Sequence, residues 1–450
     1  MNRTLSDPET LRREPELNHE DAGSSNSSNP AALRPGAFIA LRYRNFRLFF
    51  VGQMISVAGT WMQIVAQQWL IYSLTHSAEW LGILSGASAL PYVALSLHGG
   101  HLADRCSRRV IMVVTQTAMM ILAFVLAFLA SHWSPMHIQP WHIAVLSVLG
   151  GFVNAYAMPA QQAFVTDMVE DRRALGSAIA LGSLQFNLAR VLGPVLAGIA
   201  LAKFGAAICF FINGVSFIAV IISLLMMRTR PVVAVANKGS IWDGFGYIVR
   251  NSAVMRVFML VSSASFCVWS VGTLYPVYAD EFVHVVYGIV MSPALRKADS
   301  AILLSQLMAA TGAGAATGGL IAAAAANRLD RRISLYGAAF GFAGGLLLFA
   351  LVHNYALALA LLFVSSVGMV VFAVTANTTV QERAPDILRG RIMAVYALLF
   401  GGLMPAGGLE IGFIANRYGA LQAVKINILM FTIIGMVTIV WHVIDNKASS

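Results

Sequence analysis

The sequence predicts an all-α integral membrane protein with twelve transmembrane helices arranged as two groups of six. Of its 450 residues, 58% are hydrophobic and only 11% are charged, whereas about 25% of a soluble globular chain is charged. From Arg47 onward, apolar runs alternate with short polar breaks. Each run is long enough to cross a hydrocarbon core of about 30 Å as a helix. The longest internal break divides the runs into equal groups.

The apolar runs define the expected spans. They cover residues 47–74, 79–102, 110–130, 142–162, 175–202, 206–227, 254–279, 300–326, 333–352, 355–377, 390–415 and 420–444. A first bundle at 46–228, a linker at 229–253 and a second bundle at 254–445 follow from the longest break. Apolar residues recur at helical spacing from Ile241 to Val249, so we expect a short amphipathic helix on the membrane surface.

Residues 1–45 precede the first span and are rich in Ser, Asn, Pro and charges of both signs. We expect a disordered cytoplasmic tail there, because such a segment buries too little apolar surface to offset the entropy lost on ordering. Arg12 and Arg13 are followed by Glu14 and no apolar stretch. This pattern predicts neither a secretory nor a twin-arginine signal, so the first span itself is expected to direct insertion.

The basic residues are distributed unevenly across the expected membrane. Lys and Arg number 30 against 20 Asp and Glu, for a net charge of +10. If breaks alternate between the two sides, the side opposite the N-terminus holds only Lys203, Arg296, Lys297, Arg417 and Lys425. The positive-inside rule then places both termini in the cytoplasm. Because lipid headgroups account for the basic balance, we expect a multi-pass membrane protein with no nucleic-acid partner.

The two halves resemble each other in sequence. A shift of 214 residues superposes Gly176 on Gly390 and Asn213 on Asn427. A constant shift through spans five and six against eleven and twelve indicates a duplicated six-helix unit. Repeated halves are typical of transporters, because rocking one half against the other exposes a central site to each side in turn.

The second span ends in the sequence Gly99-Gly100-His101-Leu102-Ala103-Asp104-Arg105-Cys106-Ser107-Arg108-Arg109, spaced as G-x-x-x-D-R-x-x-R-R. Here the chain resembles the major facilitator superfamily, with a serine in place of the usual glycine. The resemblance implies a gating latch made of Gly100, Asp104, Arg105, Arg108 and Arg109. Asp104 would face the positive end of the eleventh span near Gly390 and pair with Arg108 while the inner side is closed. Alternatively, the arginines only fix the orientation of the chain.

A counterpart of this loop occurs in the second half, where Arg328–Arg332 matches Arg105–Arg109 at a shift of 223 residues. Asn327 stands where the carboxylate would be. A full charge at a helix terminus contributes roughly 0.3–1 kcal/mol, so we expect the second latch to be weaker.

The fifth span contains Ala189–Gly198, which is similar to the Gly-x-x-x-Gly-Pro-x-x-Gly-Gly signature of antiporter branches of this superfamily. Ala189 and Ala197 replace two of its glycines. Gly193 and Pro194 thin the helix and remove a backbone donor, so we expect a bend and close contact with a partner helix. The signature favours efflux, although a simple packing kink is an alternative.

Further similarity covers nearly all the chain after residue 40. Leu41–Arg47, Leu274–Pro276 and Leu388–Ile392 look like the exporter group that contains enterobactin exporters and macrolide efflux pumps. The segment Glu281–Asp299 makes an outer loop longer than this resemblance implies, and the sequence assigns it no role.

Two ionisable residues lie deep within expected spans and are candidates for the transport pathway. Arg190 falls near the middle of the fifth span, and Glu410 lies in the outer half of the eleventh. A carboxyl group in an apolar cavity can exchange a proton near neutral pH, so Glu410 is the leading proton-carrier candidate. Arg190 keeps its charge and could hold an anionic or catecholate substrate, or act as a counter-ion. Both could instead be structural.

Polar and aromatic side chains at helical spacing predict a roomy cavity for an amphiphilic ligand. They are Gln53, Ser56, Thr60, Trp61, Gln63 and Gln67 on the first span, Asn154 and Gln161 on the fourth, and Phe266 and Trp269 on the seventh. The alternative is hydrogen-bonded packing between helices.

The sequence contains no motif for an enzyme, a metal site or a bound cofactor. Cys106, Cys209 and Cys267 are far apart and lack metal-ligand spacing. The glycine-rich run Gly312–Gly319 lies within an apolar span and lacks the ending of a phosphate loop, so it indicates helix packing. We therefore expect no catalytic residues, and a proton gradient as the driving force.

Together these patterns predict a secondary transporter that exchanges inward protons for an outgoing small amphiphilic molecule, such as a drug or a siderophore. We expect it to act as a monomer in the lipid bilayer, by alternating access. The resemblance to the exporter group implies that this bilayer is the bacterial plasma (inner) membrane. Three alternatives remain: a dedicated siderophore exporter, facilitated uptake of a nutrient, and a membrane sensor or scaffold without transport.

Overall fold

The computed structural model describes residues 38–449, except for 170–171, 228–240, 288–292, 326–329 and 386. Every regular element in this part of the chain is a helix. Most of the expected tail at 1–45, and much of the expected linker at 229–253, lie outside the described residues.

The first half contains η1 (Ile39–Arg42), α1 (Arg44–Thr75), α2 (Ala78–Arg105), α3 (Arg108–Ala130), α4 (Pro140–Asp167), α5 (Arg172–Phe204) and α6 (Ala206–Met226). The helices that follow are α7 (Ile241–Arg250), α8 (Ser252–Ser263), η2 (Ala264–Val268), η3 (Trp269–Leu274), α9 (Tyr275–Tyr287), α10 (Pro293–Ala325), α11 (Arg331–Leu351), α12 (Tyr355–Arg383), α13 (Arg389–Tyr418) and α14 (Ala420–Ser449).

Each of the twelve expected spans coincides with helix in the structure. Within the described residues, eleven helical stretches are long and apolar enough to cross a membrane. The second span is the twelfth if its two parts, bent by 52° between Ser96 and His98, are taken together. Pro91, which lacks a backbone donor, and Gly99 flank this bend. The sequence therefore predicted the helical membrane fold correctly.

The seventh expected span is irregular, which the sequence did not indicate. It passes from α8 through the π-helical turn η2 and the 3₁₀ turn η3 into α9. A Cβ atom added to Gly407 of α13 would lie 1.8 Å from the carbonyl oxygen of Phe266 in η2. Glycine is therefore required for α13 to pack on this turn. Because a π turn changes which side chains share a helix face, it alters what the span presents to its neighbours.

The segment Glu281–Asp299 is not simply the long loop that the sequence predicts. The helix α9 continues to Tyr287, and α10 already begins at Pro293. Apolar runs mark the part of a helix that lies in lipid, so polar helix ends beyond the membrane escape that criterion.

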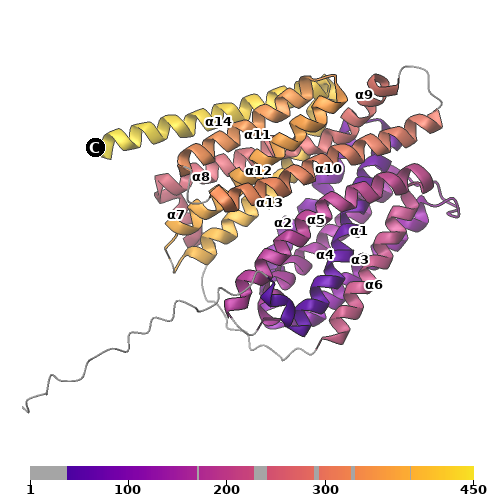
Figure 1. The fold of residues 1–450 in the computed structure, drawn as a ribbon, viewed down its shortest axis with the longest axis horizontal. Coiled ribbons are helices and arrows are strands. Elements are labelled where there is room, and N and C mark those ends of the chain that lie inside the picture. Colours follow the sequence, from indigo (N-terminus) through magenta and orange to yellow (C-terminus); the bar gives the residue numbers. More distant parts are fainter. Residues whose placement is uncertain are drawn as a thin grey trace, which may run out of the picture. The chain divides into compact units, whose positions relative to one another are not determined.

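The duplicated unit is visible in the packing. In the first half α2 packs against α4, and α3 packs against both α4 and α6. In the second half α10 packs against α12, and α11 packs against both α12 and α14. Figure 1 shows the helices α1–α6, coloured indigo to magenta, as one group and α10–α14, coloured orange to yellow, as another. The halves meet where α2 packs on α13 and α5 packs on α10.

Several contacts between the halves gather toward one end of the helices. We call it the α1–α2 end, because Thr75–Ala78 lies there, and we call the opposite end, at Arg105–Arg108, the motif end. Near the α1–α2 end, a Cβ on Gly412 would lie 2.7 Å from the carbonyl oxygen of Ala78, so α13 and α2 are in close contact. Three hydrogen bonds also join the halves there. They run from Trp69 to Ser300, from Ser77 to Asn416 and from Asn416 to Glu79.

The short helix α7 occupies the place where the sequence predicts an amphipathic helix. Its Gly244 lies against the backbone of Arg391, since an added Cβ would be 2.9 Å from that carbonyl carbon. The Tyr247 hydroxyl donates a hydrogen bond of 3.0 Å to the carbonyl oxygen of Arg383. Phe245 and Val249 remain exposed. The helix is therefore fixed to the motif end of α12 and α13.

Candidate functional site

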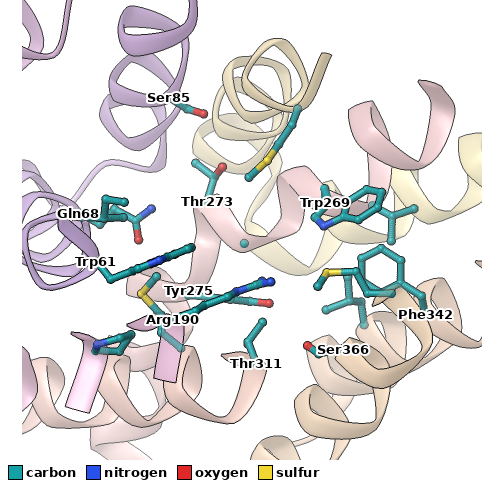
Figure 2. Close-up of a pocket in the computed structure, with 18 residues that line it drawn as sticks. Trp61, Gln68, Ser85, Arg190, Trp269, Thr273, Tyr275, Thr311, Phe342 and Ser366 are labelled. Atoms are coloured by element: carbon teal, nitrogen blue, oxygen red, sulfur yellow. The ribbon is translucent and has the colours of Figure 1, made fainter. Parts of the chain in front are cut away.

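A cavity of about 240 Å³ lies between the two halves of the chain. Figure 2 shows Arg190 and Tyr275 between Trp61 on one side and Trp269 and Phe342 on the other. The residues that line it are Trp61, Ile64, Gln68, Ser85, Arg190, Pro194, Val268, Trp269, Gly272, Thr273, Tyr275, Met308, Thr311, Phe342, Leu346, Ser366, Met369 and Met404. Both halves contribute side chains, so a molecule bound here would contact each of them.

Arg190 places a positive charge in this cavity. Its guanidinium carbon lies 5.6 Å from the centre of the Trp61 ring, a cation–π contact. The glycine one turn later allows this approach, since a Cβ on Gly193 would lie 2.4 Å from the Cβ of Trp61. No carboxylate of the described residues lies within 4 Å of Arg190. The charge therefore has an aromatic neighbour but no protein counter-ion in this part of the chain.

The helix α5 runs without interruption through Pro194. The close approach expected of the Gly193-Pro194 signature is present, as the contact with Trp61 shows. A second close contact follows on the next turn, where a Cβ on Gly198 would lie 2.0 Å from the hydroxyl oxygen of Ser305. Because Gly193 and Gly198 have no side chain, α1 and α10 both pack closely on α5 around Arg190.

The opposite wall is aromatic and sulfur-rich. The Trp269 ring packs edge-on against Phe400, at 4.7 Å between ring centres, and against Phe342, at 5.4 Å. The methionines Met308, Met369 and Met404 also line the cavity. Thioether side chains adapt to ligands of varied shape. This wall can therefore bind apolar groups of varied shape.

The cavity has few polar groups other than Arg190. Tyr275 and Thr311 both line the cavity, and the Thr311 hydroxyl donates to the carbonyl oxygen of Leu307 at 2.9 Å. Gln68, Ser85 and Ser366 also face the cavity. The site can thus combine one fixed cation, a large apolar surface and a few hydroxyl and amide groups.

Four of the expected site residues line this cavity: Trp61, Pro194, Trp269 and Arg190. Within the polar stripe on α1, Gln63 packs between helices instead, because Asn213 of α6 donates a hydrogen bond of 2.7 Å to it. Thr60 donates a hydrogen bond of 2.9 Å to the backbone of Ser56 within α1. For Gln63 this contact agrees with the alternative, hydrogen-bonded helix packing.

The remaining expected cavity residues also lie outside the lining. Gln53 is buried, with no hydrogen-bond partner for its side-chain oxygen among the described residues. Asn154 is exposed on α4, while Gln67 and Gln161 are half-buried. Phe266 is in the π turn beneath Gly407.

Several lining residues were not anticipated. On α1, the cavity face consists of Trp61, Ile64 and Gln68. These residues follow helical spacing, so the sequence pattern could have predicted this face. The neighbouring polar stripe was the more conspicuous pattern. Tyr275 and Thr311 come from spans whose mostly apolar sequence marks no face.

Glu410 does not line the cavity. Asn427 of α14 donates hydrogen bonds of 3.1 and 3.4 Å to its two carboxylate oxygens. Glu410 is half-buried, and Asn427 is fully buried. The carboxylate therefore lies between α13 and α14 and forms no ion pair with Arg190.

The loop between α2 and α3 is arranged differently from the expected latch. Arg108 pairs with Asp167 at 2.6 Å, instead of with Asp104. Asp104 is exposed, with no hydrogen bond or ion pair to another described residue, and Arg105 is exposed as well. Arg109 donates a hydrogen bond of 2.7 Å to the carbonyl oxygen of Leu225.

Within the same motif, the close contact of α2 with α4 is at Gly99 and not at Gly100. No atom lies within 4 Å of a Cβ added to Gly100, whereas one added to Gly99 would lie 2.0 Å from the carbonyl oxygen of Ala155. Consecutive helix residues point about 100° apart, so only one of the two glycines can face α4.

The second half has a corresponding ion pair. Arg331 matches Arg108 in the repeat, and it pairs with Glu382 at the end of α12. Asp330 caps α11, accepting a hydrogen bond of 2.7 Å from the backbone of Arg332. Asn327 lies outside the described residues. The repeat thus has the same pairing of a basic residue on the third helix of each half with an acidic residue on the fourth.

The described residues contain no group of three or more His, Cys, Asp or Glu side chains placed to hold a metal ion. Two repeated six-helix units around a cavity lined from both sides define a transporter of the major facilitator type. Residues 35–450 match the family described as transmembrane secretion effectors. The chain belongs to this family of multi-pass membrane transporters and is not an enzyme.

Relatives of known function are distant in sequence but similar over most of their length. The staphyloferrin A transporter of Staphylococcus aureus is 23% identical over 89% of this chain and 96% of its own. The multidrug efflux pump Tap of Mycolicibacterium fortuitum is 22% identical over 83% and 89%. The enterobactin exporter EntS of Escherichia coli is 24% identical over 80% and 85%.

Solved structures share the fold. A bacterial homologue of the human lysosomal transporter Spinster, in an inward-facing and occupied conformation, superposes with a TM-score of 0.66 at 15% identity, covering 88% of this chain and 96% of that one. The nucleoside transporter NupG gives a TM-score of 0.66 at 13% identity, covering 89% and 98%.

Proposed function

We propose that this transporter exports a small amphiphilic molecule with a negatively charged group across the bacterial inner membrane. The observation that carries the proposal is the Arg190 guanidinium, which faces a central cavity beside Trp61 with no carboxylate within 4 Å among the described residues. A charge inside a membrane span is costly, and such residues mark transport pathways. An anionic group on the substrate would supply the missing counter-charge.

The walls of the cavity support an amphiphilic substrate over a purely polar one. Trp61, Trp269 and Phe342 offer ring faces and edges, while Met308 and Met369 add adaptable apolar surface. Hydrophobic pockets with a few placed polar groups are typical of small-molecule sites. An aromatic or alkyl body with one anionic group fits both walls.

The contacts between the halves support alternating access. Hydrogen bonds and close glycine contacts join the halves near the α1–α2 end. With the termini in the cytoplasm, as the distribution of basic residues indicates, this end faces outward and the structure corresponds to an inward-facing state. Substrate would enter from the cytoplasm and leave after the α1–α2 end separates.

Export against a gradient needs an energy source, for which we propose protons. Glu410 is a half-buried carboxyl group inside a span, and its hydrogen-bond partner Asn427 carries no charge. Such a group can take up and release a proton without breaking an ion pair. Because it lies between α13 and α14 and not in the cavity, its protonation would act on helix packing, without direct competition with the substrate.

A siderophore is one specific candidate for the substrate. Two of the relatives are transporters of staphyloferrin A and enterobactin, although a third is a multidrug efflux pump. The siderophore candidate predicts higher expression on iron starvation. The drug candidate predicts that deletion sensitises the cell to several unrelated compounds.

Transport in inverted membrane vesicles tests the proposal. With a panel of fluorescent amphiphilic anions and their neutral analogues, the wild-type chain should accumulate anions inside the vesicles when a proton gradient is imposed. Arg190→Gln should abolish uptake of the anions, whereas Arg190→Lys keeps the charge and should retain part of it. Equal uptake by the wild-type chain and Arg190→Gln would contradict the proposal.

A further inference from the structure

A second cavity of about 240 Å³ lies toward the α1–α2 end, beyond the first. It too is formed by both halves. The residues that line it are Trp69, Tyr72, Ser73 and His76 of α1, Pro276 and Asp280 of α9, and Arg296, Lys297, Ser300 and Leu304 of α10. None of these residues lines the first cavity.

The two cavities follow one another along the same helices. On α1, the first cavity ends at Gln68 and the second begins at Trp69. Tyr275 and Pro276 divide the cavities in the same way at the start of α9. On α10, Leu304 and Met308 are four residues apart, a distance of about 6 Å along the helix. A molecule leaving the first cavity toward the α1–α2 end would therefore meet the second.

The second cavity repeats the chemistry of the first, with a cationic group opposite aromatic rings. Arg296 forms a two-pronged ion pair with Asp280, with nitrogen–oxygen distances of 2.8 and 3.1 Å. Next to it, the Lys297 side chain is exposed and makes no hydrogen bond or ion pair with a described residue. Among the described lining residues, Asp280 balances Arg296, so the ammonium group of Lys297 is the unbalanced charge. The neighbouring Glu281 carboxylate does not line the cavity, but it is close enough to act electrostatically on Tyr72.

The aromatic side of the second cavity is also ordered. The Trp69 indole N–H donates a hydrogen bond of 3.2 Å to the Ser300 hydroxyl, which joins the two halves across the cavity. The ring of Tyr72 packs edge-on against His76, with 5.7 Å between ring centres. The Trp69 and Tyr72 side chains thus face the cationic residues from the opposite half.

We propose that this second cavity is an exit site for the transported anion. The anionic group would bind Lys297 and share Arg296 with Asp280, while its apolar body lies against Trp69 and Tyr72. The exit site would hold the substrate after it leaves Arg190, and separation of Trp69 from Ser300 would release it. The direction of this sequence rests on the proposed export function, but the existence of the second site does not.

Equilibrium dialysis of the full chain in lipid nanodiscs tests the proposal, with 2-naphthoate as an aromatic anion and 2-naphthamide as its neutral analogue. We expect two naphthoate sites per chain. Lys297→Gln should weaken one site about tenfold, the range of one charge-assisted hydrogen bond, and Arg190→Gln should weaken the other. Arg417→Gln is the matched control, because Arg417 lies at the same end over the Tyr418 ring and lines neither cavity.

One naphthoate site in the wild-type chain, or a second site that Lys297→Gln leaves unchanged, would overturn the proposal. Equal dependence of naphthoate and naphthamide on Lys297 would also overturn it, since the lysine would then not recognise charge. The vesicle assay separates this outcome from failure of the proposed function. If export depends on Arg190 but the chain has a single binding site, only the exit-site proposal fails. If the chain has two binding sites but does not export, only the proposed function fails.

Discussion

The Arg108 guanidinium lies 2.6 Å from the Asp167 carboxylate and joins the first turn of α3 to the last turn of α4. Arg108 also donates hydrogen bonds of 3.3 Å to the carbonyl oxygens of Ala103 and Ala163. The side chains of Arg108 and Asp167 are only 18% and 13% exposed. In this conformation Arg108 of the G-x-x-x-D-R-x-x-R-R motif therefore stabilises its own half, and the aspartate of the motif, Asp104, is available to another partner.

We predict that Asp167→Asn destabilises the chain, because it leaves the half-buried charge of Arg108 without its partner. The expected loss is about 1.5–3 kcal/mol, the range for a hydrogen bond to a charged group. Thermal unfolding of the detergent-purified protein measures it. Asp104→Asn is the control and should unfold at the wild-type temperature. Equal destabilisation by the two variants would mean that the Arg108–Asp167 pair is not what holds this end together.

Asp104→Asn should instead slow transport turnover. Its carboxylate makes no contact with a described residue in this conformation, so any role belongs to the state in which the motif end is closed. Turnover in vesicles, normalised to the amount of inserted protein, measures this effect. If Asp104→Asn turns over at the wild-type rate, Asp104 does not act as a latch.

Alanine substitutions at the two adjacent glycines of α2 should have very different effects on stability. Gly99→Ala would place a Cβ 2.0 Å from the carbonyl oxygen of Ala155, which must force α2 away from α4. Overpacking of this kind costs about 1–3 kcal/mol. Gly100→Ala meets nothing within 4 Å and should be tolerated. Comparison of their yields of folded protein and unfolding temperatures checks the register of α2; the reverse order would show that the register is wrong.

Glu410→Gln should abolish proton-driven accumulation while some exchange of substrate down its gradient continues. The amide keeps a hydrogen-bonding partner for Asn427 but cannot carry the proton. Accumulation in inverted vesicles, with and without an uncoupler, distinguishes the two activities. Undiminished pumping by this variant would eliminate Glu410 as the proton carrier.

The number and position of the spans could be predicted because the bilayer imposes length and apolarity on every helix that crosses it. Which face of a helix points inward could not be predicted in the same way. In a bilayer, the faces toward lipid and toward other helices are both apolar, so periodicity seldom separates them. Gln63 illustrates this, since its amide bonds to Asn213 and does not reach the cavity.

The local geometry of the seventh span could not be predicted from the sequence either. The π turn at Ala264–Val268 lies where Gly407 of a distant helix contacts the Phe266 carbonyl. A contact across more than a hundred residues leaves no local pattern. Arg190 could be identified from sequence alone, because a charge in the middle of a span is conspicuous whatever its surroundings.

The central claim, that transport requires the two halves to separate at the α1–α2 end, can be tested by one crosslink. Ser77 and Asn416 come from opposite halves, and their side chains are joined by a hydrogen bond of 3.1 Å. Cysteines at both positions, in a chain whose three native cysteines are replaced, should form a disulfide on oxidation. The two single-cysteine variants, Ser77→Cys and Asn416→Cys in the same background, are the controls, because neither can form the crosslink. We predict that the Ser77–Asn416 crosslink stops export and that reduction restores it, while oxidation of the single-cysteine variants has no effect. Full export with the Ser77–Asn416 crosslink in place would contradict the account.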